Sequence, residues 1–165
     1  GIEKLAVINL MGQYGMPTVE NPFNWAKKLV TNLQEQNIKN IFLDFHAEVT
    51  SEKRIMLMMF KNQISAICGT HTHVGTDDLQ IFENTAYLTD IGLTGCRDNV
   101  IGMDSKIPIQ KVTTGIGGHF EVPNSCKSIL QMLVVDIDDG KASSAFKIKK
   151  YCNNSKLFIT EAFID

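Results

Sequence analysis

The sequence lacks any long apolar run and any excess of charge of one sign. Its longest uninterrupted apolar stretch is Ile55–Phe60, far short of the roughly 20 residues that cross a bilayer as a helix. Sixteen Lys and Arg stand against eighteen Asp and Glu, so the net charge is −2. A nucleic-acid polymer normally needs a basic face or stripe. We therefore expect no membrane-spanning segment and no nucleic-acid polymer as a partner.

Cysteine pairs at zinc-ribbon spacing are also missing. The four cysteines are Cys68, Cys96, Cys126 and Cys152, and none belongs to a Cys-x-x-Cys motif, which argues against a zinc ribbon. Their even number is compatible with a secreted disulfide framework, but no signal-peptide pattern supports it. We therefore expect reduced thiols and a cytoplasmic protein.

Two common catalytic signatures do not occur. The glycine-rich residues 113–118 lack the Gly-Lys-Ser/Thr of a phosphate-binding loop, and there is no Gly-x-Ser-x-Gly nucleophile elbow. Cys68 lies in an apolar, strand-like segment, which favours an inert buried thiol over a nucleophile. His119 follows two glycines and stands alone, so we interpret it as a surface histidine of a loop.

What the chain does contain is an alternation of strand and helix patterns. Strands are expected at Leu5–Leu10, Ile38–Phe45 and Ser65–Gly69, the first two of them buried. Between them, Asn21 and Pro22 predict the start of an amphipathic helix, and Thr50 or Ser51 that of a second helix ending near Asn62. This order predicts a layered α/β fold in one domain.

The second half of the chain has a different pattern. Hairpins are expected over residues 79–89 and 129–150, the latter around Asp138-Asp139-Gly140, where Asp-Gly is a strong turn signal. Residues 92–118 are glycine-rich and irregular, with a short helix near Met103. We find no internal repeat and no linker, so a single domain is expected.

Three of the four histidines lie at the ends of two predicted strands. His46 ends one strand, and His71 and His73 end the next. Ligands of α/β sheets bind beyond the carboxyl ends of the strands, and an i, i+2 spacing in an extended segment directs two rings to one side. Imidazoles in this arrangement suit zinc, iron or manganese. The pattern therefore predicts that His46, His71 and His73 are metal ligands, although a single histidine at a strand end is more often a hydrogen-bonded core residue.

Two carboxylates accompany these histidines. Asp44 shares the strand face of His46, and Glu48 follows shortly after it. They are candidates for residues that orient the imidazoles by hydrogen bonding. An equally acceptable interpretation is that Asp44 caps local backbone and Glu48 is solvated.

The same residues resemble a known family. The segments Asp44–Lys53 (DFHAEVTSEK) and Gly69–Val74 (GTHTHV) are similar to signature motifs of the YmdB-like bacterial phosphodiesterases, which belong to the calcineurin-like metallophosphoesterase superfamily. The similarity continues over Leu5–Gly12, Tyr87–Gly95, Ile101–Asp104 and Val134–Asp139. It therefore covers nearly the whole chain.

The resemblance implies an αββα-sandwich fold, two divalent metal ions (iron, manganese or magnesium) and hydrolysis of 2′,3′-cyclic AMP-type nucleotides. It implies that His46 and His71 ligate one metal and His73 the other. Homo-oligomers are common in this family, so we expect self-association. The family's Gly-Asp, Asn-Gly-Glu-Asn and Gly-Asn-His segments, which carry the acidic ligands and the proton donor, do not occur in this sequence.

We therefore expect residues 1–165 to be the C-terminal portion of a single metallophosphoesterase domain that lacks its N-terminal half. The chain begins with Gly1, directly before a predicted core strand, which agrees with this interpretation. No catalytic proton donor is expected within the chain, and on its own it should be inactive. Two alternatives stay open: a broad phosphomonoesterase, and a non-catalytic regulatory or assembly module that uses Ile55–Phe60 and the loop after Gly92 as contact surfaces.

Overall fold

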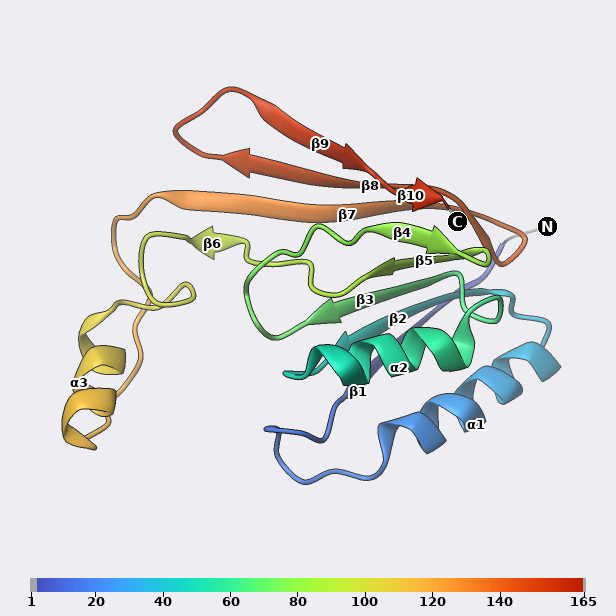
Figure 1. Ribbon diagram of the computed structural model, residues 1–165, viewed down its shortest axis with the longest axis horizontal. Helices are drawn as coiled ribbons and strands as arrows, with labels where there is room; N and C mark the ends of the chain where they lie inside the picture. Colours follow the sequence, from blue (N-terminus) through green and yellow to red (C-terminus); the bar gives the residue numbers. More distant parts are fainter. Residues whose placement is uncertain (1–2, 165) are drawn as a thin grey trace.

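Two β-sheets lie face to face, and two helices cover the outer face of one of them (Figure 1). The computed structural model describes residues 3–164. The first sheet has the strand order β1-β2-β3-β5-β4-β10. Its strands are β1 (Leu5–Met11), β2 (Asn40–His46), β3 (Ala66–Thr70), β4 (Gln80–Phe82), β5 (Thr85–Leu88) and β10 (Phe163–Ile164). The neighbours β1, β2, β3 and β5 pair in parallel, so their carboxyl ends share one edge of the sheet.

The helices α1 (Pro22–Glu35) and α2 (Thr50–Phe60) are the crossovers between these parallel strands. The expected cap of α1 is confirmed, because the Asn21 side chain accepts hydrogen bonds from the backbone N–H groups of Phe23 and Asn24. Alternate residues of β2, including Leu43 and Phe45, pack against the helices in the main core cluster. The expected central strand at 38–45 is therefore confirmed.

The second sheet is antiparallel, with the order β6-β7-β8-β9. It consists of β6 (Gly95–Cys96), β7 (Ser128–Asp138), β8 (Lys141–Tyr151) and β9 (Leu157–Glu161). Asp139 and Gly140 both have positive φ, as expected for the Asp-Gly turn between β7 and β8. Ala142 and Ala145 of this sheet pack against Ala66, Ile81 and Leu88 of the first, and this second core cluster joins the two sheets.

The layers match the αββα expectation in part. Residues 3–164 form a helical layer and two stacked sheets, and within them no helix covers the outer face of the second sheet. The remaining helix, α3 (Lys106–Thr114), stands off to one side of the sheets (Figure 1) and has no buried residue. Among the described residues, no helix has the length and apolar character needed to cross a bilayer.

The interpretation of Leu5–Leu10 as a buried strand is wrong. β1 lies at the edge of the first sheet, and Leu5 and Val7 are 57% and 68% exposed. The apolar composition of β1 predicted burial on both faces, but only alternate residues, such as Ile8, contact the helices. The α2 stretch Ile55–Phe60 is likewise divided: Met56 and Phe60 are in the core, whereas Ile55 is exposed.

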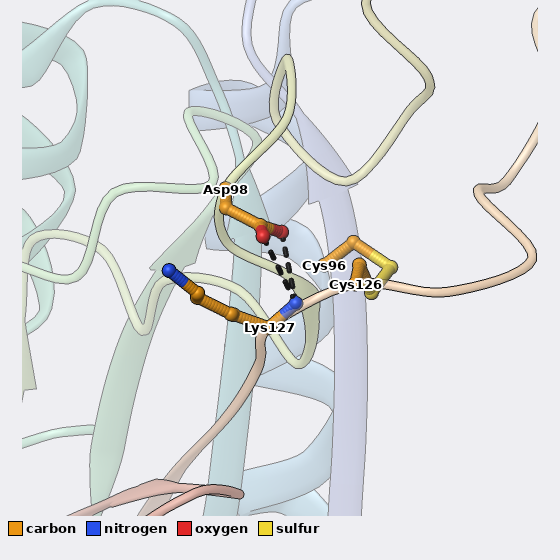
Figure 2. The surroundings of a disulfide bond; sticks show 4 residues. All are labelled: Cys96, Asp98, Cys126 and Lys127. Atoms are coloured by element: carbon orange, nitrogen blue, oxygen red, sulfur yellow. Dashed lines mark hydrogen bonds between the residues drawn. A yellow bond between two sulfur atoms is a disulfide. The ribbon is translucent and has the colours of Figure 1, made fainter.

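The expectation of reduced thiols is wrong for one pair. Cys96 and Cys126 form a disulfide, with their Cα atoms 5.6 Å apart. Figure 2 shows a second contact beside the disulfide. The Asp98 carboxylate accepts the backbone N–H of Lys127 at 3.0 and 3.1 Å from its two oxygens. That hydrogen bond is the main cause that lowers the pKa of Asp98. The spacing of 30 residues has no local signature, so sequence reasoning could not find this pair.

Thiol accessibility gives a direct test of the pairing. Cys152 is exposed, whereas Cys68 is buried and burial raises the pKa of its thiol to about 12. We expect iodoacetamide to modify only Cys152 in the native, unreduced protein, because the thiolate is the reactive form. After reduction and unfolding, all four cysteines should be modified. Peptide mass spectrometry measures both patterns, and labelling of Cys96 or Cys126 without reductant would contradict the disulfide.

Candidate metal centre at the carboxyl edge of the first sheet

The parallel pairing of β2 and β3 brings two histidines together. His46 is the last residue of β2 and lies opposite Thr70, the last residue of β3. His71 follows directly. The two imidazole rings pack edge to face, with their centroids 4.7 Å apart. Both histidines therefore lie at strand ends, as the sequence predicts.

A chain of hydrogen bonds fixes the orientation and tautomer of His46. The Thr70 hydroxyl donates to Asp44 Oδ1 at 2.8 Å, and Asn9 Nδ2 donates to Asp44 Oδ2 at 2.8 Å. Since the hydroxyl hydrogen is used on the carboxylate, the Thr70 oxygen accepts from His46 Nδ1, which is 3.0 Å away. Neutral His46 therefore carries its proton on Nδ1 and has a lone pair on Nε2.

His71 is held from the opposite side. Its Nε2 lies 3.1 Å from Glu48 Oε2, and its Nδ1 lies 3.0 Å from Nε2 of His46. The Glu48 carboxylate is therefore within ion-pair distance of the His71 ring. Since Nε2 of His46 carries a lone pair, Nδ1 of His71 is the donor in the hydrogen bond between the two rings. A cation that binds both nitrogens would replace this proton.

This contact meets one requirement of a metal site. Two nitrogens that are each about 2.1 Å from one ion and at right angles lie about 3.0 Å apart, which matches the spacing of His46 Nε2 and His71 Nδ1. The opposite nitrogen of His46 has the Thr70 oxygen as its acceptor, and that of His71 lies 3.1 Å from a Glu48 carboxylate oxygen. Oxygen partners of this kind are usual for histidines that bind metals. Among residues 3–164, however, no group of three or more His, Cys, Asp or Glu side chains converges closely enough to hold an ion. The pair thus fits one side of a coordination shell.

His73 does not join this pair. Its Nδ1 donates to the backbone carbonyl of Ile101 at 2.7 Å, so its Nε2 is the nitrogen with a lone pair. Ile101 has positive φ and lies at the tip of a turn closed by paired hydrogen bonds between Val100 and Met103. His119 is exposed, which agrees with its interpretation as a surface residue.

Burial lowers the pKa of His46, and the neighbouring His71 lowers it further, while Asp44 partly opposes them. The neutral imidazole is the form that can bind a metal ion. The electrostatic environment of His46 therefore favours its ligating form near neutral pH.

Sequence reasoning missed two residues of this arrangement, Asn9 and Thr70. Each is a polar residue in or at the end of an apolar strand, and in the sheet register Asn9 lies opposite Asp44. A polar residue that interrupts an apolar strand was the available signal. This signal identifies Asn9 and Thr70 as partners of the site only when the register of the strands is known.

The fold and this site define a layered α/β protein with a histidine centre at the carboxyl edge of a parallel sheet. Comparison with known proteins gives the family. The family described as "YmdB-like protein" matches residues 1–150. The chain is 40% identical over 153 residues to a 2′,3′-cyclic-nucleotide 2′-phosphodiesterase of Bacillus subtilis, which covers 92% of this chain and 57% of that protein.

A putative phosphatase/phosphodiesterase of Mycoplasma genitalium is 40% identical over 125 residues, covering 73% of this chain and 43% of that protein. A crystal structure of a novel phosphatase from Mycoplasma pneumoniae matches with a TM-score of 0.68 and 30% identity, over 94% of this chain and 52% of the other. A hypothetical protein from Thermus thermophilus matches with a TM-score of 0.77 and 25% identity, over 94% of this chain and 57% of the other.

The chain belongs to the YmdB-like family, so the resemblance found in the sequence is confirmed. It spans about half the length of the curated relatives that it matches.

The link between Thr70 and His46 can be tested by removing one hydroxyl. Thr70→Val leaves the His46 Nδ1–H and Asp44 Oδ1 without their partner, and such a loss costs about 1–3 kcal/mol when the groups are partly buried. Urea unfolding measures the cost, and ¹⁵N NMR of the imidazole measures the tautomer of His46, which should no longer be fixed. Thr113→Val on exposed α3 is the matched control, with an expected change within about 0.5 kcal/mol. An unchanged His46 spectrum would contradict the hydrogen-bond chain.

The lowered pKa of His46 predicts an acid-sensitive stability. Because the pKa of His46 in the folded protein lies below the ordinary histidine value of 6.5, the neutral form is favoured by folding. The contribution of His46 to the free energy of unfolding is fully present above pH 6.5. It is lost as the pH falls through the pKa of His46 in the folded protein. In metal-free buffer, the free energy of unfolding should therefore fall more steeply between pH 7 and pH 5 in the wild type than in His46→Gln. The control His119→Gln should show the same dependence of the free energy of unfolding on pH as the wild type. If His46→Gln also shows the wild-type dependence, the contribution of His46 is refuted.

Proposed function

We propose that this chain carries the histidine side of a two-metal centre in a phosphodiesterase that hydrolyses 2′,3′-cyclic nucleotides. The observation that carries the proposal is the His46–His71 contact, in which the facing nitrogens lie 3.0 Å apart and each opposite nitrogen has an oxygen atom close by. The name of the Bacillus subtilis relative, which is 40% identical, supports the substrate class.

In this proposal, His46 and His71 bind one divalent cation and His73 binds the other. Iron, manganese or magnesium at these positions would offset negative charge on the phosphate oxygens. The chain's own residues have a defined part: Thr70 holds the proton on His46 Nδ1, and the Ile101 carbonyl holds it on His73 Nδ1. Each acceptor leaves the other nitrogen of its ring ready to bind. Glu48 lies beside His71 Nε2 and would orient that ring.

The acidic ligands and the proton donor would come from residues outside the chain. This follows from the resemblance, and the greater length of the relatives supports it. The chain alone should therefore bind metal weakly and show little or no turnover.

A phosphomonoesterase is the second candidate, because the Mycoplasma pneumoniae relative of known structure is named a phosphatase. The two activities need the same cations and histidines and differ in the ester they accept. Comparing nitrophenyl phosphate with 2′,3′-cyclic AMP as substrates separates them: a far larger kcat/KM for the monoester would favour the second candidate.

The proposal is tested on residues 1–165 and on the longest native form of the protein that contains them. With Mn²⁺, the longer form should hydrolyse 2′,3′-cyclic AMP, lose this activity with a chelator and regain it when Mn²⁺ is returned. His71→Ala should lower kcat/KM by about 100-fold or more, whereas the control His119→Ala should not. Vigorous Mn²⁺-dependent hydrolysis by residues 1–165 alone would overturn the proposed division of the site.

A further inference from the structure

The segment that carries His71 and His73 has an unusual backbone. Both histidines have positive φ, 108° and 62°, a region that residues with a Cβ rarely occupy. Conformations of this kind persist where the surrounding structure holds them, and they cluster at functional sites. Thr72 lies between them, so a contact that holds the backbone of Thr72 bears on the position of both histidines.

The Asp90 carboxylate holds the backbone at this position. Its Oδ2 accepts the N–H of Thr72 at 3.1 Å, and its Oδ1 accepts the N–H of Gly92 at 2.9 Å. The main chain of Asp90 also binds the far end of the segment, because its carbonyl accepts the N–H of Thr76 at 3.0 Å and its N–H donates to the Thr76 hydroxyl at 3.0 Å. Asp90 thus secures the backbone on both sides of His73.

The charge of Asp90 is balanced from helix α2. Lys53 Nζ lies 2.9 Å from Asp90 Oδ2, and both side chains are 1% exposed. The lysine passes beside Gly69, where a Cβ would come within 2.8 Å of Lys53 Cδ and 1.7 Å of the Thr89 carbonyl oxygen. Only glycine at this position allows so close an approach. Leaving a buried carboxylate without its cation is strongly disfavoured, so loss of Lys53 would disturb the Asp90 carboxylate and the hydrogen bond that it accepts from Thr72.

We propose that Lys53 and Asp90 are positioning residues of the metal centre: their buried ion pair fixes the Thr72 amide and so sets the placement of His71 and His73. This inference rests on the proposed function only for the identity of the bound species. The geometric part, that the ion pair controls the two rings, holds for the metal-free protein as well.

The test compares three lysine variants: one that removes the charge of Lys53, one that keeps it, and a control that removes another lysine. Lys53→Met keeps most of the side-chain length and removes the charge, whereas Lys53→Arg keeps the charge. Lys61→Met removes a lysine near the other end of α2 whose partner, Glu83, is half exposed. Circular dichroism establishes that each variant is folded at the temperature used.

Two properties are then measured on the folded proteins: the imidazole signals and the affinity for Co²⁺. In the metal-free state, ¹⁵N NMR of the imidazoles should show shifted His71 and His73 signals in Lys53→Met, smaller shifts in Lys53→Arg and none in Lys61→Met. When the longest native form is titrated with Co²⁺ and followed by visible absorption, its Lys53→Met variant should bind at least about tenfold more weakly than the wild type. Wild-type ring signals and Co²⁺ affinity in a folded Lys53→Met protein would overturn the proposal, whatever its stability.

A further measurement needs no variant. Hydrogen exchange of the wild type should show the Thr72 amide protected to the level of neighbouring strand amides, because its acceptor is buried. Rapid exchange at Thr72 would overturn the proposal even if Lys53→Met fails to fold. Failure of the longest native form to bind Co²⁺ would count against the metal centre itself, while the NMR and exchange results would still decide the role of the ion pair.

Discussion

The parallel register of β2 and β3 is the constraint on which the candidate site depends. It places His46 opposite Thr70, and so puts two successive strand ends, with their polar residues, within hydrogen-bond distance. A shift of one residue would turn every side chain of β2 to the other face of the sheet. Asp44 and His46 would then face the opposite side, and core residues such as Phe45 would leave the contact with the helices. The packing of the core and the geometry of the site are therefore set by the same pairing.

Helix α2 shows how one element serves both the core and the site. Its second half places Met56, Leu57 and Phe60 in the core. Its first turn carries two buried charged residues, Glu52 and Lys53, each with a partner from another segment. Glu52 accepts the backbone N–H groups of the loop that follows β1, while Lys53 reaches the segment after β5. Charged side chains at such depth are tolerated only when they are paired, which is why these loops keep a fixed position relative to the sheet edge.

Much of the fold could be predicted from the sequence, because local signals determine it. The Asn21 cap, the Asp-Gly turn between β7 and β8 and the central strand β2 follow from capping, turn chemistry and periodicity. The exposed face of β1 could not be predicted, since strand burial depends on what neighbours lie beside it. The Cys96–Cys126 pair and the Lys53–Asp90 pair join residues 30 and 37 positions apart, and nothing in the local sequence marks either contact. In the site, residue types identified the histidines, but only the register revealed Asn9 and Thr70.

The three histidines are held by different parts of the structure. The oxygen atoms that contact His46 and His71 belong to the sheet edge and the turn that follows β2, next to the paired strands. The acceptor of His73 is the Ile101 carbonyl, within the segment that leaves the sheets after β6 and returns at β7. That segment buries little apolar surface in α3, and the disulfide between Cys96 and Cys126 ties its two ends. Since closing a chain segment at its base restricts the positions open to all of its residues, the covalent link contributes to the placement of Ile101. The His73 ring therefore depends on a cross-link outside the sheet in addition to the Asp90 contacts of its own segment, whereas His46 depends on the sheet itself.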